Sequence, residues 1–247
     1  MKTLFSICLI ISLLLVNSVF AAEWSVMPIN LHLSAQAKSQ TLTVSNSGKK
    51  TLRAQAKTVV WTQKDGIDVQ EETKDLVFYP KIIVVPPGQD RIIRLGLAHP
   101  QIPTVEKAYR IILEEIPEPV VDEPTKSTSA KVNIITVMSV PIFLLPKDGK
   151  PSLEVVSNKI GTGLDVSVKN TGNVHANLRR IVINGVDASD KQVCSVVQQA
   201  WYLLPGISRN YQIKLPSDCA KATSFGVEVI QDNAKTLSQV TTNVSAQ

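Results

Sequence analysis

Apolar and polar residues alternate in short runs over almost the whole chain. The alternation is clear from Thr41 to Ser45, from Leu52 to Trp61, from Ile92 to Leu97 and from Leu164 to Val168. A period of two residues is typical of β-strands that bury one face. Long stretches with the helical period are missing from the sequence, so the pattern predicts an all-β fold.

Turn-forming residues separate the predicted strands. The segments Lys64-Asp65-Gly66, Asp148-Gly149 and Asn184-Gly185 carry the Asp-Gly or Asn-Gly pairs that favour tight turns. Pro87-Gly88 and Pro205-Gly206 suit type II turns, because proline fixes φ and glycine accepts a positive φ. Short strands between such turns are typical of β-sandwiches.

A polar joint bounded by prolines, from Pro146 to Pro151, divides the chain into halves. About seven strand-like runs precede this joint and about seven follow it, which is the strand number of an immunoglobulin-like sandwich. We therefore predict two immunoglobulin-like β-sandwich domains, an N-terminal domain over residues 22–146 and a C-terminal domain over residues 147–247.

The first 21 residues predict a secretory signal peptide. Lys2 provides the positive start, Leu4 to Val16 form the apolar region, and Val19-Phe20-Ala21 offers a cleavage site. An N-terminal anchor helix is the alternative, but the apolar run is short for a membrane span. The signal predicts an exported protein from which residues 1–21 are cleaved on export.

Charge and cysteine content narrow the function classes. The 26 Lys and Arg residues exceed the 21 Asp and Glu residues. They are scattered without interleaved aromatic residues, however, so nucleic-acid binding is weakly supported. Cys8 is lost with the signal, which leaves Cys194 and Cys219 as a single pair. An oxidising compartment favours a structural disulfide over two free thiols or a metal pair.

The sequence offers little for catalysis or metal binding. His32, His99 and His175 are far apart in sequence and lack the spacing of metal ligands. The known nucleophile, zinc-protease, phosphate-loop and dinucleotide motifs are missing. Glu114 and Glu115 are neighbours, but adjacent strand residues point to opposite faces. We therefore expect no enzyme activity, no cofactor and no metal.

The apolar strand after Lys131 carries apolar residues on both of its faces. One parity has four of them: Val132, Ile134, Met138 and Val140. The other parity has Ile135 and Val137. Two interpretations remain open. The strand is either central and buried on both sides, or it lies near a sheet edge where its second apolar face awaits a partner chain.

Several segments together resemble the periplasmic chaperones of the chaperone–usher pilus pathway. They are Thr41 to Asn46, the block from Tyr79 to Arg94 with its YP and PPGQ motifs, the block from Glu106 to Pro117 with its YR and EEIP motifs, and the apolar strand that runs into Val140-Pro141-Ile142-Phe143. Asn170 to Val174 and the later cysteine pair are similar to the second domain of the same family. The resemblance covers nearly all of the mature chain and is nearer to the archaic and alternative branches.

The resemblance implies a periplasmic chaperone that binds pilus subunits by donor-strand complementation and delivers them to an outer-membrane usher. The donor strand expected from the sequence presents Val132, Ile134, Met138 and Val140 to the subunit. We expect the free chaperone to cap this apolar strand by forming homo-oligomers. The alternatives are a two-domain immunoglobulin-like pilus subunit or adhesin, and an exported enzyme on the same fold. A full strand count in both halves favours the donor of a strand.

The usual pair of basic residues that holds the C-terminal carboxylate of a subunit is missing from this sequence. Family members carry an arginine in the first strand and a lysine in the donor strand. The matching positions hold Asn30 and Pro141, or Ser139 if the strand has a bulge. The carboxylate anchor is therefore expected elsewhere in the chain.

Arg110 is the candidate anchor, because it lies among apolar residues where an unpaired guanidinium is unfavourable. The alternative is an internal salt bridge with Glu106 or Glu114. Arg91 and Arg94 are weaker candidates in a strand whose charges can face water.

Glu106 and Asp232 match the acidic members of an ionic cluster that orients the two domains in the family. The position of the basic member holds Leu145, so the expected cluster is incomplete.

Overall fold

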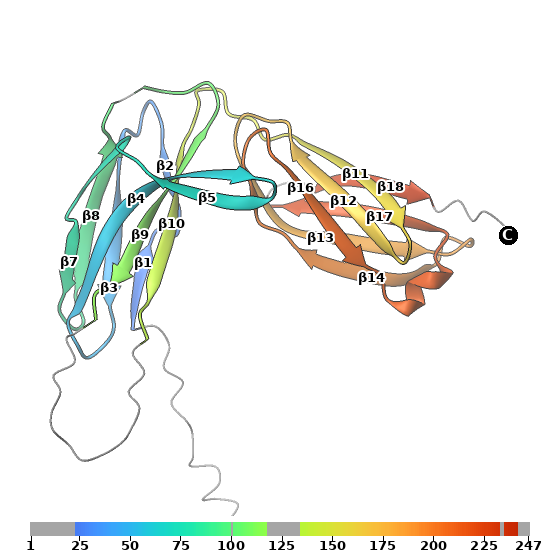
Figure 1. Ribbon diagram of the computed structural model, residues 1–247, viewed down its shortest axis with the longest axis horizontal. Coiled ribbons are helices and arrows are strands. Elements are labelled where there is room, and N and C mark those ends of the chain that lie inside the picture. Colours follow the sequence, from blue (N-terminus) through green and yellow to red (C-terminus); the bar gives the residue numbers. More distant parts are fainter. Residues whose placement is uncertain (1–22, 100, 118–133, 233–234, 242–247) are drawn as a thin grey trace, which may run out of the picture.

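The computed structural model describes residues 23–99, 101–117, 134–232 and 235–241. Two β-sandwiches follow one another along the chain and meet at an angle (Figure 1). Besides its strands, the described part contains the short 3₁₀ helix η1 (Ser217–Lys221). Within these residues, helices of a length and apolarity that could cross a membrane are absent. The predicted all-β fold with two sandwiches is confirmed.

The first sandwich contains the strands β1 to β10. Their bounds are β1 (Trp24–Met27), β2 (Leu31–Leu33), β3 (Ser39–Asn46), β4 (Leu52–Lys64), β5 (Ile67–Glu72), β6 (Leu76–Tyr79), β7 (Ile82–Val85), β8 (Asp90–Leu97), β9 (Lys107–Glu115) and β10 (Val137–Leu144). One sheet has the order β1-β3-β8-β6. The other has the order β2-β10-β9-β4-β5, and β7 pairs with β4.

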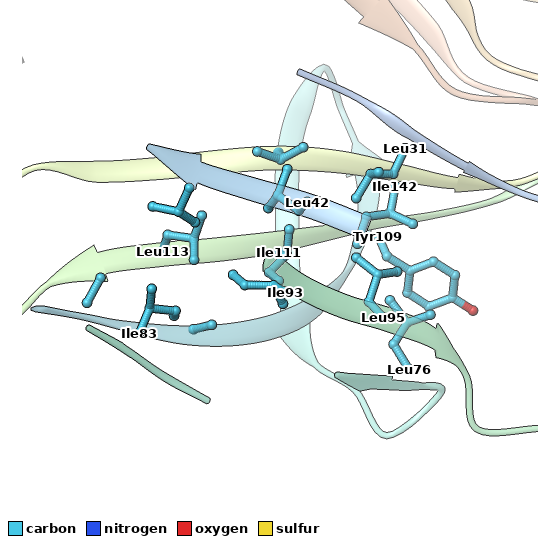
Figure 2. Close-up of a cluster of buried hydrophobic side chains, with 14 of the residues drawn as sticks. Leu31, Leu42, Leu76, Ile83, Ile93, Leu95, Tyr109, Ile111, Leu113 and Ile142 are labelled. Carbon is cyan, nitrogen blue, oxygen red and sulfur yellow. The ribbon is translucent and has the colours of Figure 1, made fainter. Parts of the chain in front are cut away.

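The core of the first sandwich is formed by alternate residues of facing strands (Figure 2). On β9, Tyr109, Ile111 and Leu113 point inward, while Leu42 on β3 and Ile93 on β8 reach them from the opposite sheet. Burial of one such side chain contributes about 1.5–3 kcal/mol relative to exposure. The alternation read from the sequence is therefore the alternation of core and surface positions.

The first strand of this domain changes sheets. β1 pairs with β3 in one sheet. After the cis peptide bond between Met27 and Pro28, the chain crosses to the other sheet and continues there as β2. There β2 runs parallel to β10, but it pairs only with Ile142 to Leu144. The rest of β10 is therefore left without β2 at its side.

A long hairpin of β4 and β5 extends from the first domain toward the second (Figure 1). Its turn has positive φ angles at Asp65 and Gly66, 52° and 77°, as a tight Asp-Gly turn requires. This confirms the turn predicted at Lys64-Asp65-Gly66. At the tip, the guanidinium Nη2 of Arg209 in the second domain donates a hydrogen bond to the carbonyl of Gly66.

The second sandwich contains the strands β11 to β18. Their bounds are β11 (Leu153–Ile160), β12 (Gly163–Asn170), β13 (Ala176–Val186), β14 (Gln192–Gln199), β15 (Tyr202–Leu203), β16 (Ser208–Lys214), β17 (Ser224–Gln231) and β18 (Lys235–Thr241). The order of one sheet is β11-β12-β16. The order of the other is β14-β13-β17-β18, with β15 on β13.

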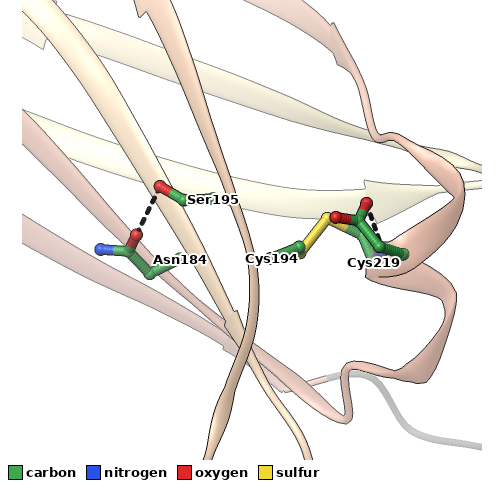
Figure 3. The surroundings of a disulfide bond; sticks show 5 residues. Asn184, Cys194, Ser195 and Cys219 are labelled. Atoms are coloured by element: carbon green, nitrogen blue, oxygen red, sulfur yellow. Dashed lines mark hydrogen bonds between the residues drawn. A yellow bond between two sulfur atoms is a disulfide. The ribbon is translucent and has the colours of Figure 1, made fainter.

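The turn predicted at Asn184-Gly185 is wrong, because both residues lie within β13. Gly185 serves close packing instead: a Cβ there would lie 2.7 Å from the Sγ of Cys194 and 2.9 Å from Phe225. Cys194 on β14 and Cys219 in η1 form a disulfide beside this position, which confirms the predicted pair (Figure 3). The small residue thus leaves room for the cross-link between β14 and η1.

Replacing Cys194 and Cys219 with alanine is expected to lower the free energy of unfolding of the second domain by about 3 kcal/mol. The bond joins residues 25 positions apart, so its removal returns conformational entropy to the unfolded chain. Chemical denaturation, with hydrogen exchange on β14 and β17, measures the loss. The reduced wild type is the control and should show the same loss. Unchanged protection of β17 in both proteins would contradict the expectation.

Candidate functional site

The first half of β10 is a free strand edge. On one side β10 pairs with β9 from Val137 to Leu144, and on the other side β2 reaches only Ile142 to Leu144. Among the described strands, none pairs with residues 137–141 on that second side. The backbone N–H and C=O groups on this side, apart from the nitrogen of Pro141 that carries no hydrogen, can therefore pair with a strand of another chain.

Apolar side chains are exposed at the same edge. Ile134 is 85% exposed, Ile135 is 47% exposed and Val137 is 55% exposed. Large apolar residues that gather at an unpaired strand edge are unusual on the surface of a protein that has no partner. This end of the first domain therefore has the chemistry of a protein-binding surface.

The predicted donor residues do not share one environment. Val140 is 2% exposed and belongs to the core of the first domain, and Met138 packs against that core. On the other parity, Ile135 and Val137 are exposed, and Ile134, which precedes β10, is exposed as well. Within β10, Met138 and Val140 therefore face the core that the opposite sheet completes, and the side chains that a subunit receives stay a prediction. Val132 lies outside the described residues.

A cleft of about 340 Å³ lies between the two domains, close to the middle of β10. The first domain lines it with Ile29, Trp61, Gln63, Asp68, Arg110, Ser139 and Pro141, and the second with Trp201, Tyr202 and Arg209. Arg110 pairs with Pro141 across the β9–β10 ladder, which places the arginine beside the free edge. The cleft and the edge therefore form one continuous surface, which we call the β10 surface (residues 134–141 and the cleft).

Arg110 is held on the face of an aromatic ring. Its Cζ lies 3.9 Å from the ring centroid of Trp61, a cation–π contact. Nη1 donates a hydrogen bond to Ser139 Oγ at 3.3 Å, and Nη2 lies 3.8 Å from an oxygen of Asp68. The expected alternative partners Glu106 and Glu114 are not the ones observed; the neighbouring carboxylate is Asp68.

The hydrogen-bonding capacity of Arg110 is not used up. Burial lowers the pKa of Arg110 from its ordinary value, while the nearby Asp68 carboxylate opposes this shift. The Nε atom is buried without a hydrogen-bond partner, and the contact with Asp68 is longer than a hydrogen bond. The guanidinium is thus a pre-positioned cation that can accept a better-placed anion.

A buried glutamate also joins the two domains. The Glu106 side chain is fully buried, and both of its oxygens lie 2.9 Å from Nδ1 of His175 in the second domain. The His175 ring stacks on Phe143 at 3.7 Å between ring centroids, and His32 lies nearby. Burial and the neighbouring His175 both lower the pKa of His32, so its neutral form is favoured. The three aromatic rings fill the junction between the sandwiches.

Gln63 provides a second link between the domains. Its side-chain Nε2 donates to the carbonyl of Tyr202 at 2.9 Å, and its Oε1 accepts from the N–H of Leu204 at 3.0 Å. The same Nε2 donates to Asp68 at 2.9 Å. The hairpin of β4 and β5 therefore fixes both the second domain and the carboxylate that faces Arg110.

The remaining residues singled out from the sequence lie in other places. Arg91 and Arg94 are exposed on β8, which belongs to the sheet without β10. Asp232 pairs with Arg179 inside the second domain, so it does not join the domains. Leu145 packs against the apolar junction. The link expected from Glu106 is formed with His175 instead.

Sequence reasoning missed His175, Gln63 and Trp201. His175 comes directly after the segment from Asn170 to Val174 that carries the resemblance, which was the one available signal. In the part of the chain that the structure describes, His, Cys, Asp and Glu side chains do not gather into a group that could hold a metal ion.

Residues 25–150 match the family model for the N-terminal domain of PapD, a pili and flagellar-assembly chaperone. This match spans more than half of the 247 residues. The chain therefore belongs to the family of pilus and flagellar-assembly chaperones, as the sequence motifs predicted. Comparison with curated protein sequences finds no match.

Solved structures show the same two-domain fold. A chain of the CsuC–CsuE chaperone–tip adhesion subunit pre-assembly complex, from archaic chaperone–usher Csu pili of Acinetobacter baumannii, matches with a TM-score of 0.63 and 19% identity over 88% of this chain and 98% of that chain. A chain of the Salmonella enterica SafA pilin–SafB chaperone complex gives 0.58 and 14% over 92% and 98%. The E. coli chaperone DraB gives 0.56 and 18% over 89% and 96%.

Proposed function

We propose that this chain is a periplasmic chaperone that captures pilus subunits by adding β10 to their incomplete fold and passes them to an outer-membrane usher. The observation that carries the proposal is the free edge of β10 over residues 137–141, beside exposed apolar side chains. An extended strand with an open edge supplies backbone hydrogen bonds, and its alternate side chains supply specificity.

The subunit would receive the side chains of one parity of β10. Ile135 and Val137 point away from the chaperone core, whereas Met138 and Val140 are used inside it. Insertion of each exposed side chain into the groove of a subunit would contribute about 1.5–3 kcal/mol, before the cost of association is subtracted. Ile134, and Val132 outside the described residues, would extend the contact at the start of the strand.

The cleft would hold the C-terminal carboxylate of the subunit. Arg110 lies across the ladder from Pro141, at the end of the open edge, so a strand paired with β10 would bring its end to the guanidinium. The contact between Nη2 of Arg110 and Asp68 is 3.8 Å long, so an incoming carboxylate could form a shorter, charge-assisted contact than Asp68 does.

Two further parts of the proposal follow from the exposed surface and the sequence. The free chaperone would form homo-oligomers that cover the β10 surface, because open apolar edges promote association. Export to the periplasm follows from the signal peptide predicted over residues 1–21, which lie outside the described residues.

Co-expression in the periplasm with a pilus subunit encoded beside this chain tests the proposal. We expect a soluble one-to-one complex on the tagged chain, and a subunit that is degraded or insoluble in its absence. Size-exclusion chromatography of the free chain should show oligomers that give way to the complex. A subunit that is equally soluble and unbound without this chain would contradict chaperone function.

A further inference from the structure

Two exposed apolar side chains face the cleft from opposite domains. Trp201, between β14 and β15, is 71% exposed, and Ile29, between β1 and β2, is 71% exposed. Both line the cleft that contains Arg110. Exposed tryptophan is informative because this residue is usually largely buried and is enriched at the centres of binding sites. We call this pair the apolar wall (Ile29 and Trp201).

The charges of the cleft favour an anionic ligand. Two guanidinium groups, those of Arg110 and Arg209, line it against the single carboxylate of Asp68. Arg209 already donates through Nη2 to the carbonyl of Gly66, whereas Nη2 of Arg110 lies 3.8 Å from Asp68, beyond hydrogen-bonding distance, and can take up a closer anion. A ligand that contacts both the Arg110 guanidinium and the apolar wall therefore carries a carboxylate next to an apolar side chain.

The last residue of a polypeptide has this combination of groups. Its α-carboxylate and its side chain branch from the same Cα, so both fit a cleft of about 340 Å³ that holds a cation and an apolar surface. Carboxylates inside a polypeptide come from Asp and Glu, which lack an apolar side chain beside the charge. The chemistry of the cleft thus favours a C-terminal residue over an internal acidic one.

We propose that the apolar wall binds the side chain of the subunit's C-terminal residue and selects subunits that end in a large apolar residue. This inference rests on the proposed function and adds a specificity site to it. Trp201 belongs to the second domain, whereas β10 belongs to the first. The second domain accordingly takes part in choosing the subunit, and the junction formed by Gln63 and His175 sets the distance between wall and anchor.

Competition among subunits with different C-terminal residues tests this proposal. Variants of one subunit that end in Phe, Leu, Ser or Asp are co-expressed with the chaperone, and the captured fractions are measured by mass spectrometry. We expect the wild type to favour Phe and Leu over Ser and Asp by roughly 30-fold, the ratio that corresponds to a binding hot spot of about 2 kcal/mol.

Chaperone variants identify the residue responsible. Trp201→Ala should remove this preference while still capturing subunits through β10, and Trp201→Phe should retain most of it. Val197→Ala is the matched control, because Val197 is exposed on β14 but does not line the cleft. An undiminished preference in Trp201→Ala would overturn the apolar wall and leave the proposed function standing. A wild type that captures no subunit at all would overturn both.

Discussion

Changing Val137 to aspartate should abolish capture of the pilus subunit while the chaperone itself stays folded. Val137 is more than half exposed and points away from the core of the first domain, so the free protein tolerates a charge there. In the proposed complex the same position is buried in the subunit. A carboxylate without a partner in that position is strongly unfavourable, because its desolvation is not compensated.

Two further substitutions make this experiment decisive. Val156→Asp is the matched control, since Val156 is a similarly exposed valine on β11 of the second domain, and it should capture normally. Val140→Asp places the charge on the opposite face of β10, inside the core, and should unfold the first domain. Pull-down of the co-expressed subunit and thermal unfolding measure the two effects. Normal capture by Val137→Asp would contradict strand donation through this face.

The alternation along the chain was sufficient to predict the fold class. A strand that buries only one face has apolar residues on that face and polar residues on the other, so its sequence alone shows which face is buried. On β3, for example, Leu42 and Val44 are core residues, and the polar Thr43 and Ser45 are not. For the strand after Lys131, the sequence did not show which face is buried, since both of its faces are apolar. Only the neighbours of β10 decide which parity is buried, and those neighbours are distant in sequence.

The candidate anchor could be named from the sequence, but its surroundings could not. Arg110 was distinctive as a lone cation in an apolar run. Its contacts come from residues with weak sequence signals: Trp61 is one of several apolar residues on β4, and Asp68 lies on a hairpin strand that is mostly polar. They meet only because the long hairpin folds against β9 and reaches the second domain.

The junction between the domains brings together two histidines that are far apart in the sequence. His32 and His175 lie in different domains, yet their ring centroids are 6.4 Å apart, and both rings contact Phe143. Sequence separation says nothing about such proximity, because it depends on the angle between two sandwiches. That angle is held by Glu106 on one side and by Gln63 on the other. Both are polar residues whose partners are backbone or imidazole groups of the other domain.

Arg110→Ala is the second change with a large expected effect: it should abolish stable capture of the subunit while leaving the fold intact. The side chain lies on the outer face of β9, away from the core residues Tyr109 and Ile111, so its loss creates no cavity in the sandwich. Arg110→Lys should rescue capture only weakly, because an ammonium group lacks the planar stack on Trp61 and the paired donors. Arg91→Ala, on the exposed face of β8, is the control and should behave as the wild type.

Asp68→Asn should act in the opposite direction and strengthen capture. In the free chaperone the Asp68 carboxylate lies 3.8 Å from Arg110, so an incoming carboxylate has to compete with it. Asparagine removes the competing charge, and its amide oxygen can still accept the hydrogen bond from Gln63 that Asp68 accepts now. Dissociation of the complex, measured by displacement with a differently tagged chaperone, should become slower. A faster dissociation, or normal capture by Arg110→Ala, would show that the carboxylate is not held in this cleft.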